Sequence, residues 1–291
     1  MKSLMGKMHK AAVKICGIVV VLALTLLPAW ALVHSFNANA IPLNRKVVKI
    51  ESLKPRPQDQ QPLQPFNEPL ITVSFDDGWE SVYTQALSIL QQDNIPTTQF
   101  IIAGEFSNSD YMSLDQVKSL KNAGHEIGSH TMTHPDLTRL SDGQIMQELG
   151  DSKATLATIQ PGISDFAIPY GAINSKVTYY IKKYYRSDRL SDGSKTYSPI
   201  NDINTSANFD IYGIRAIAVT AGTNLATLQS YINYAKNNNG WLVLVYHQIN
   251  KQPNDEYAID KEVFKKQMDL INKSGVRIAT EGRVLDALQG L

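Results

Sequence analysis

The chain has 291 residues, of which 43% are hydrophobic and 19% charged, a composition that is ordinary for a globular protein and excludes global disorder. Its formal net charge of +1 hides an asymmetry, because residues 1–40 carry four lysines and no acid, which leaves 24 basic against 27 acidic side chains elsewhere. A net charge of −3 on that remainder argues against nucleic acid as a partner, since a nucleic-acid-binding domain needs a basic surface to meet phosphates.

The N-terminus has the order of a secretory signal, with basic residues, an apolar run and then small residues. Ile15 to Val33 is an uncharged run of 19 residues, and Ala38-Asn39-Ala40 follows in an A-x-A arrangement. Because the run is close to membrane-spanning length, residues 1–40 are predicted to be a cleaved signal peptide or an uncleaved anchor. Both interpretations predict that the rest of the chain is exported to the periplasm, the cell envelope or the medium. It would contact the membrane only through this segment. A buried core helix is the competing interpretation.

The only cysteine, Cys16, lies within this apolar run. The rest of the chain therefore has no disulfide framework and no thiolate that could act as a nucleophile or a metal ligand. Residues 51–69 are rich in Pro and Gln and cannot bury a core, so residues 41–69 are predicted to be a linker.

From residue 70 to residue 291, strand and helix patterns alternate in one predicted domain. Strands are expected over residues 70–75, 97–103, 125–129, 165–168, 214–219, 241–246 and 276–279. Helices are expected over residues 81–94, 113–123, 141–159, 174–184, 225–238, 261–273 and 281–288, with Ser113 as an N-cap. Residues 187–213 give weak signals and are expected to be loop. The alternation predicts an α/β fold with parallel strands, in a barrel or a doubly wound sheet, and a site at the carboxyl ends of the strands.

Two carboxylates follow the first predicted strand, in the segment Ser74–Gly78 (SFDDG). Adjacent strand residues point to opposite faces, so Asp76 and Asp77 can share a site only where the strand ends, and Gly78 permits a bend there. Paired carboxylates repel, and a cation on one of them would leave the other free as a base. The alternative is a solvated turn, for which Asp-Asp-Gly is common.

Two histidines lie four residues apart in Gly128–Pro135 (GSHTMTHP). One helical turn would place His130 and His134 on one face, where they could bind zinc, which takes three protein ligands and a water in catalytic sites. Pro135 is expected to end such a turn. The alternative is a pair of solvent-exposed loop histidines, and His125 is expected to be structural.

Two further predicted strands end in candidate site residues. Phe166–Gly171 (FAIPYG) ends in a Pro-aromatic-Gly turn, in which backbone N–H groups can face a ligand. His247 ends the apolar strand over residues 241–246, where an imidazole can act as an acid or a base. A plain turn and a buried structural histidine are the respective alternatives.

In this order, the four segments resemble the motifs of the polysaccharide deacetylase family, the NodB-homology or carbohydrate esterase family 4 enzymes. Ser74–Gly78 is similar to the family's TFDDG motif, and His125–His134 (HEIGSHTMTH) is similar to HEIGxHTxxH. Phe166–Gly171 resembles a variant of RxxPYG, and Val245–His247 resembles LxH. The resemblance spans about residues 70–249 and implies a distorted (β/α)₇ barrel.

The resemblance also implies roles for the matching residues and a divalent metal, most often zinc, as cofactor. The reaction implied is hydrolysis of N-acetyl groups from an N-acetylhexosamine-containing polysaccharide or envelope glycan, with release of acetate. The residues at the family's functional positions are Asp76 (general base), His247 (general acid), Asp77, His130 and His134 (metal ligands), and Pro169 and Tyr170 (oxyanion and substrate).

One position departs from the family pattern. Ala167 stands where the family has the arginine that holds the catalytic aspartate. Arg189 or Arg186, in the segment YRSDRLSDG, is a candidate to supply the missing guanidinium, and the alternative is that both are surface residues. The family's fourth motif is not assigned, and Asp188 and Asp192 are only candidates for it.

Other functions remain open on the sequence alone. An O-acyl esterase could use the same site, because the mechanism needs only an acyl carbonyl. A catalytically silent glycan-binding envelope protein is disfavoured, because a dead site has no physical need for clustered carboxylates and imidazoles. A glycosidase acting through Asp76 and Asp77 is disfavoured, because adjacent residues do not reach a carboxylate separation of roughly 5–9 Å across a sugar. The polymer, the metal and the oligomeric state are left open.

Overall fold

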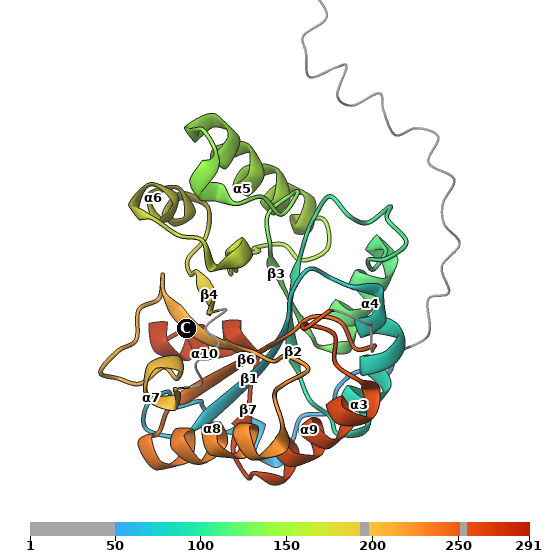
Figure 1. Ribbon diagram of the computed structural model, residues 1–291, viewed down its shortest axis with the longest axis vertical. Coiled ribbons are helices and arrows are strands. Elements are labelled where there is room, and N and C mark those ends of the chain that lie inside the picture. The colour runs from blue at the N-terminus through green and yellow to red at the C-terminus, as the bar shows by residue number, and fades with distance from the viewer. Residues whose placement is uncertain (1–49, 193–197, 251–254) are drawn as a thin grey trace, which may run out of the picture. The chain divides into compact units, whose positions relative to one another are not determined.

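The computed structural model describes residues 50–192, 198–250 and 255–291 (Figure 1). The predicted export segment and residues 41–49 of the predicted linker lie outside these ranges. Within them, no helix is both long enough and apolar enough to cross a bilayer.

Parallel strands form the centre of the domain, as the alternating sequence pattern predicts. The strands are β1 (Leu70–Phe75), β2 (Thr97–Ile101), β3 (Glu126–Ser129), β4 (Arg189–Asp192), β5 (Ile214–Ala218), β6 (Trp241–Tyr246) and β7 (Arg277–Ile278). Their order in the sheet is β3-β2-β1-β6-β5-β4, and β7 pairs with the first two residues of β1. β1 and β6 pair along their whole lengths, from Leu70 with Trp241 to Phe75 with Tyr246.

A short extended segment joins the two edges of this sheet. Phe166 forms a parallel bridge to Ser129 at the end of β3, and Ala167 forms one to Arg189 at the start of β4. These two residues occupy the place of the strand predicted over residues 165–168. The sheet is thereby curled into a distorted barrel, which confirms the barrel prediction over the doubly wound sheet.

Helices and shorter turns surround the barrel (Figure 1). The helices are α3 (Leu87–Gln92), α4 (Leu114–Ala123), α5 (Asp142–Ala157), α6 (Ser175–Tyr184), α7 (Pro199–Asp202), α8 (Leu225–Asn238), α9 (Lys261–Lys273) and α10 (Glu281–Gln289). The short 3₁₀ helices are η1 (Pro57–Gln60), η3 (Leu137–Arg139) and η4 (Pro169–Gly171), and η2 (Val82–Ala86) is a π-helix that continues into α3. Ser113 caps α4 through a capping box, as predicted, and Gly124 ends it in the left-handed conformation.

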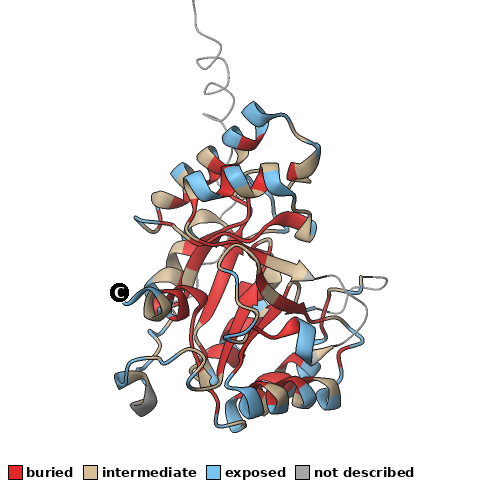
Figure 2. Ribbon diagram, turned by 90° about the vertical axis from the view of Figure 1, so that its left-hand side faces the viewer, coloured by how far each residue is buried: buried red, intermediate tan, exposed pale blue. Residues whose placement is uncertain are grey.

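The alternation of side chains along the strands separates the core into layers. Ile71, Val73 and Phe75 pack outward in a cluster with residues of α8 and α9. Leu70 packs in the barrel interior, in a cluster with Trp241 of β6 and Val284 of α10. Figure 2 shows the buried strands enclosed by helices whose outer faces are exposed. The inward positions at the carboxyl ends of the strands are therefore the ones available to a site.

β4 and α7 lie in the stretch that the sequence analysis expects to be loop. β4 has the sequence Arg-Leu-Ser-Asp, with one apolar residue in four. Arg189 is wholly buried, and Ser191 pairs with Ala216 of β5. Because polar residues occupy β4, it carries no apolar run by which a strand could be recognised.

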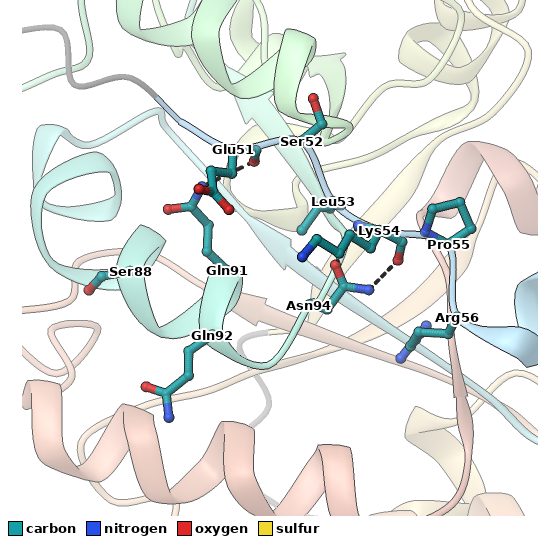
Figure 3. A pocket seen from close by; sticks show the side chains of 10 residues that line it. All are labelled: Glu51, Ser52, Leu53, Lys54, Pro55, Arg56, Ser88, Gln91, Gln92 and Asn94. Carbon is teal, nitrogen blue, oxygen red and sulfur yellow. Dashed lines mark hydrogen bonds between the residues drawn. The ribbon is translucent and has the colours of Figure 1, made fainter.

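Residues 50–69, which the composition predicts to be linker, lie against the domain. The Leu53 N–H donates to the Ala123 carbonyl at 2.8 Å, and Arg277 pairs with Glu68 at 2.9 Å. Figure 3 shows residues 51–56 passing α3, where the Asn94 side chain exchanges two hydrogen bonds with the backbone of Lys54. These contacts fix the segment to the barrel wall.

Gly128 of β3 is required by the packing of the barrel interior. A Cβ atom at this position would lie 2.6 Å from two ring carbons of Phe100. We predict that Gly128→Ala lowers the free energy of unfolding by about 1–3 kcal/mol through overpacking, measured by urea denaturation. Gly143→Ala in α5 is the control, because a Cβ there would meet no atom within 4 Å. Equal stabilities for the two variants would contradict this account.

His125 makes the stability of the metal-free chain depend on pH. Its Nδ1 is 2.8 Å from the Thr97 hydroxyl, and burial lowers the pKa of His125 to about 4. Because the unfolded chain then binds more protons below pH 6.5, folding stability falls as the pH falls towards 4. Between pH 7 and pH 5, protonation of His125 in the unfolded chain should lower the free energy of unfolding by about 2 kcal/mol. Urea denaturation of His125→Gln should show a pH dependence smaller by that amount, and an unchanged dependence would contradict the assignment.

Candidate functional site

A pocket of about 220 Å³ lies at the carboxyl ends of the strands. Its lining is made up of Asp76, Asp77, His130, His134, Ile168, Tyr170, Ser191, His247 and Tyr257. It therefore brings together residues from four segments that the sequence analysis singled out. Pro169 is buried at the start of the η4 turn that carries Tyr170. The larger hollow of about 570 Å³ beside residues 51–56 contains no histidine in its lining (Figure 3).

Asp77, His130 and His134 point one ligand atom each at a common position. Their candidate ligand atoms all lie within 4.8 Å of one another. Asp77 Oδ1 is 3.5 Å from His130 Nε2 and 3.4 Å from His134 Nε2. One carboxylate and two imidazoles around a shared point form a donor set that suits zinc and other divalent transition metals.

The hydrogen bonds around these three side chains fit a cation at that point. His130 Nδ1 lies 2.7 Å from the Ala167 carbonyl, which can only accept, so the proton is on Nδ1 and Nε2 carries a lone pair. Burial lowers the pKa of His130 to about 4, although Asp76 and Asp77 act in the opposite direction, so the imidazole is neutral. Asp77 Oδ1 is buried and has no hydrogen-bond partner within the described part of the chain. A cation bound between them would accept the lone pair of His130 Nε2 and pair with Asp77 Oδ1.

The two histidines converge through a loop and not through the helical turn that their spacing suggests. Residues 130–135 are non-helical, and His134 has a φ of 61°. The His134 N–H donates to the Thr131 hydroxyl at 2.9 Å, which closes the loop. Glu148 of α5 accepts hydrogen bonds from the Met132 and Thr133 N–H groups, both at 2.9 Å. The prediction of a turn of helix was wrong because these side-chain bonds replace the helical ones.

Left-handed backbone is concentrated at this site. Seven non-glycine residues in the described ranges have a positive φ. Four of them lie at the site, namely Asp77, Thr131, His134 and Tyr170, with φ values from 60° to 71°. Such conformations cost of order 1–3 kcal/mol each and persist only where the surroundings enforce them. The ligand directions are therefore imposed by the barrel and its loops.

Asp76 forms a buried ion pair with Arg189 in the barrel interior. The Arg189 guanidinium donates to Asp76 Oδ1, and both side chains are within 2% of complete burial. The guanidinium also lies over the ring of Phe100, 4.8 Å from its centroid. Burial alone would raise the pKa of Asp76, but the charge and the hydrogen bond of Arg189 act in the opposite direction, and the pKa lies below its usual value. Asp76 is therefore an ionised carboxylate inside the protein.

Two more buried carboxyls, Asp188 and Glu281, share the electrostatic environment of Arg189. Burial raises the pKa of Asp188 and of Glu281 well above the usual range, although the Arg189 charge acts in the opposite direction on each. One guanidinium cannot neutralise three buried carboxylates. Arg189 donates its hydrogen bond to Asp76, so Asp76 is the carboxyl whose charge is stabilised, whereas burial favours the protonated form of Asp188 and Glu281.

The family pattern has its arginine at the position of Ala167. Arg189 lies on the neighbouring strand, directly beside that position. The two residues are bridge partners, and Ala167 is wholly buried. Side chains at such paired positions start roughly 5 Å apart, so a guanidinium can reach the same carboxylate from either strand. Arg186 instead pairs with Asp165 at 2.7 Å and with Asp286 at 2.5 Å.

His247 faces the same pocket from the end of β6. Its Nδ1 is buried with no hydrogen-bond partner among the described residues. Its ring lies 4.9 Å from that of Tyr257, which also lines the pocket. The exposed ring of Tyr170 lies at another side of the pocket, and its hydroxyl is 3.0 Å from His134 Nδ1.

Sequence reasoning missed Trp79, Glu148 and Ser191 as residues of the site. Glu148 comes from α5, which follows the histidine loop, and Ser191 comes from β4, two residues after Arg189, but neither belongs to a motif. Trp79 directly follows Asp-Asp-Gly, and its indole N–H donates to Asp77 Oδ2 at 2.8 Å. Its place beside the carboxylates is a signal that could have found it.

Comparison with known proteins agrees with this geometry. Residues 64–186 match the family model of polysaccharide deacetylases. A peptidoglycan-N-acetylglucosamine deacetylase of Bacillus cereus is 34% identical over 114 residues, which cover 39% of this chain and 52% of that protein. A chitooligosaccharide deacetylase of Rhizobium leguminosarum bv. trifolii is 32% identical over 109 residues, covering 37% and 49%. The chain thus spans about half the length of the curated relatives it matches.

Solved structures show the same fold. A family 4 acetyl xylan esterase from Clostridium thermocellum, solved with a cobalt ion, aligns with a TM-score of 0.52 at 18% identity. The alignment covers 76% of this chain and 92% of that one. At this identity the likeness establishes the fold alone. Residues 64–186, the four motifs and the barrel are thus similar to those of the polysaccharide deacetylase family.

Proposed function

We propose that this chain is an exported, metal-dependent hydrolase that removes N-acetyl groups from an N-acetylhexosamine-containing envelope glycan and releases acetate. The observation that carries the proposal is an ionised, buried Asp76 placed beside the Asp77–His130–His134 cluster. His130 Nε2 lies 4.0 Å from Asp76 Oδ2, so the carboxylate is next to the ligand atoms without replacing one. The names of the relatives support the substrate class, and the N-terminal segment supports export.

Each side chain has a role that follows from its place in the pocket. A divalent cation such as zinc would polarise the acetyl carbonyl and lower the pKa of a water molecule. Asp76 takes a proton from the attacking water, because it is ionised and held in place by Arg189. The Tyr170 backbone N–H donates to the oxyanion that develops on the carbonyl oxygen. His247 protonates the departing sugar amine, so that water and the amide yield acetate and a free amino sugar.

The first test is acetate release from N-acetylglucosamine oligomers by the purified full chain, followed by mass spectrometry with zinc and with a chelator. We expect zinc-dependent release, and we expect Asp76→Asn to lower kcat by about 100- to 10,000-fold while zinc still binds. Asp188→Asn is the matched control, because it replaces a buried carboxyl whose pKa is raised by burial and which accepts no hydrogen bond from Arg189, and it should leave kcat within a few-fold. Release of acetyl groups from esters but not from these amides would overturn the proposal in favour of an O-acyl esterase. Binding of the glycan without any release would favour the silent glycan-binding protein.

A second test concerns Arg189, which we propose to be the positioning residue for Asp76. Arg189→Lys should lower kcat by about 100-fold, because the single ammonium does not reproduce the planar guanidinium, and zinc affinity should stay unchanged. Arg189→Ala should also raise the pKa of Asp76 and move the acidic limb of the kcat/KM profile to higher pH.

The controls for this prediction use the two neighbouring positions. Arg186→Ala should lower the free energy of unfolding, because Asp165 loses its ion-pair partner, and it should leave kcat unchanged. In Arg189→Ala, an added Ala167→Arg substitution should recover part of kcat, because these residues are bridge partners. A normal kcat and a normal pH profile in Arg189→Lys and Arg189→Ala would refute the role.

A further inference from the structure

We propose that Trp79 is a positioning residue of the metal site, whose indole N–H holds one oxygen of Asp77 and leaves only the other for the cation. The inference rests on the proposed function, because it concerns the metal that this function requires. It assigns a role to a residue that is neither a metal ligand nor part of the pocket lining.

The two oxygens of Asp77 have different surroundings. Oδ2 accepts the hydrogen bond from Trp79 Nε1 at 2.8 Å. Oδ1 faces His130 Nε2 and His134 Nε2 at 3.5 Å and 3.4 Å, and it is the buried oxygen with no hydrogen-bond partner among the described residues. The indole therefore selects which oxygen faces the metal position.

Trp79 is itself held rigidly by the segment that precedes α4. Its ring stacks on Tyr111, with centroids 4.5 Å apart and planes 19° apart, and the two residues form an antiparallel backbone bridge. On either side, the Glu80 N–H donates to the Asp110 carbonyl at 2.9 Å and the Met112 N–H donates to the Gly78 carbonyl at 2.7 Å. An indole clamped in this way presents its N–H in one direction.

The consequence concerns the number of positions left open on the cation. A carboxylate that binds through one oxygen leaves a position for water or the acetyl carbonyl, whereas a bidentate carboxylate would occupy it. His130 and His134 are oriented in the same manner, by the Ala167 carbonyl at 2.7 Å and the Tyr170 hydroxyl at 3.0 Å. Trp79 completes this set of outer partners, which fix ligand orientation in metal sites.

The test is the metal affinity of Trp79→Phe, which removes the N–H and keeps a ring against Tyr111. The full chain, freed of metal, is titrated with Zn²⁺ in competition with a chromophoric chelator, and Co²⁺ is used to record the visible spectrum. We expect the Kd for Zn²⁺ to rise by about 10- to 100-fold. The Co²⁺ absorption should weaken, because a second Asp77 oxygen raises the coordination number. Tyr111→Leu, which removes the stack and keeps the indole, should raise the Kd by a smaller factor.

Trp241→Phe is the matched control, because it removes a buried indole N–H that donates to the Thr72 hydroxyl at 2.9 Å inside the barrel. It should lower the melting temperature and leave the Kd and the Co²⁺ spectrum unchanged. A Trp79→Phe chain with the original Kd and spectrum overturns the inference alone, and so does an equal loss of affinity in Trp241→Phe. If the unsubstituted chain binds neither metal, the proposed function fails together with the inference.

Discussion

The buried ion pair between Arg189 and Asp76 is the interaction on which the site depends. Burying a carboxylate inside a barrel costs desolvation free energy. Here the buried guanidinium of Arg189 offsets that cost by pairing with Asp76. That guanidinium lies on the ring of Phe100, and the ring has room only because β3 carries Gly128 at the facing position. A glycine in one motif thus supports the charge of an aspartate in another, through two side chains that belong to neither.

The parts of the fold and the site that sequence predicts are those encoded locally. β6 is a continuous apolar run, and β1 is apolar at four of its six positions; each strand is followed directly by a candidate catalytic residue, His247 or Asp76. β4 escapes prediction because polar residues face the interior there, so its identity as a strand depends on pairing with β5. The choice between Arg189 and Arg186 likewise depends on which residue faces inward and what the other one meets.

The loop around the two histidines illustrates a different limit. The spacing of His130 and His134 fits a turn of helix, yet the chain brings them together with Thr131 and His134 in left-handed conformations. Hydrogen bonds from this loop to Glu148, which lies on the following helix α5, help to hold that geometry. A sequence motif therefore records which side chains meet, while the backbone path by which they meet is set by tertiary contacts.

The barrel is not equally strong around its circumference. β1 and β6 share six paired residues, whereas the join between β3 and β4 consists of single bridges at Phe166 and Ala167. Ala167 orients His130 through its carbonyl, and its bridge partner Arg189 holds Asp76. Local opening at this seam needs far fewer broken bonds than global unfolding. Opening of this seam on heating would displace the groups that orient His130 and Asp76 while most of the barrel stays folded. Loss of activity on heating would therefore precede loss of structure.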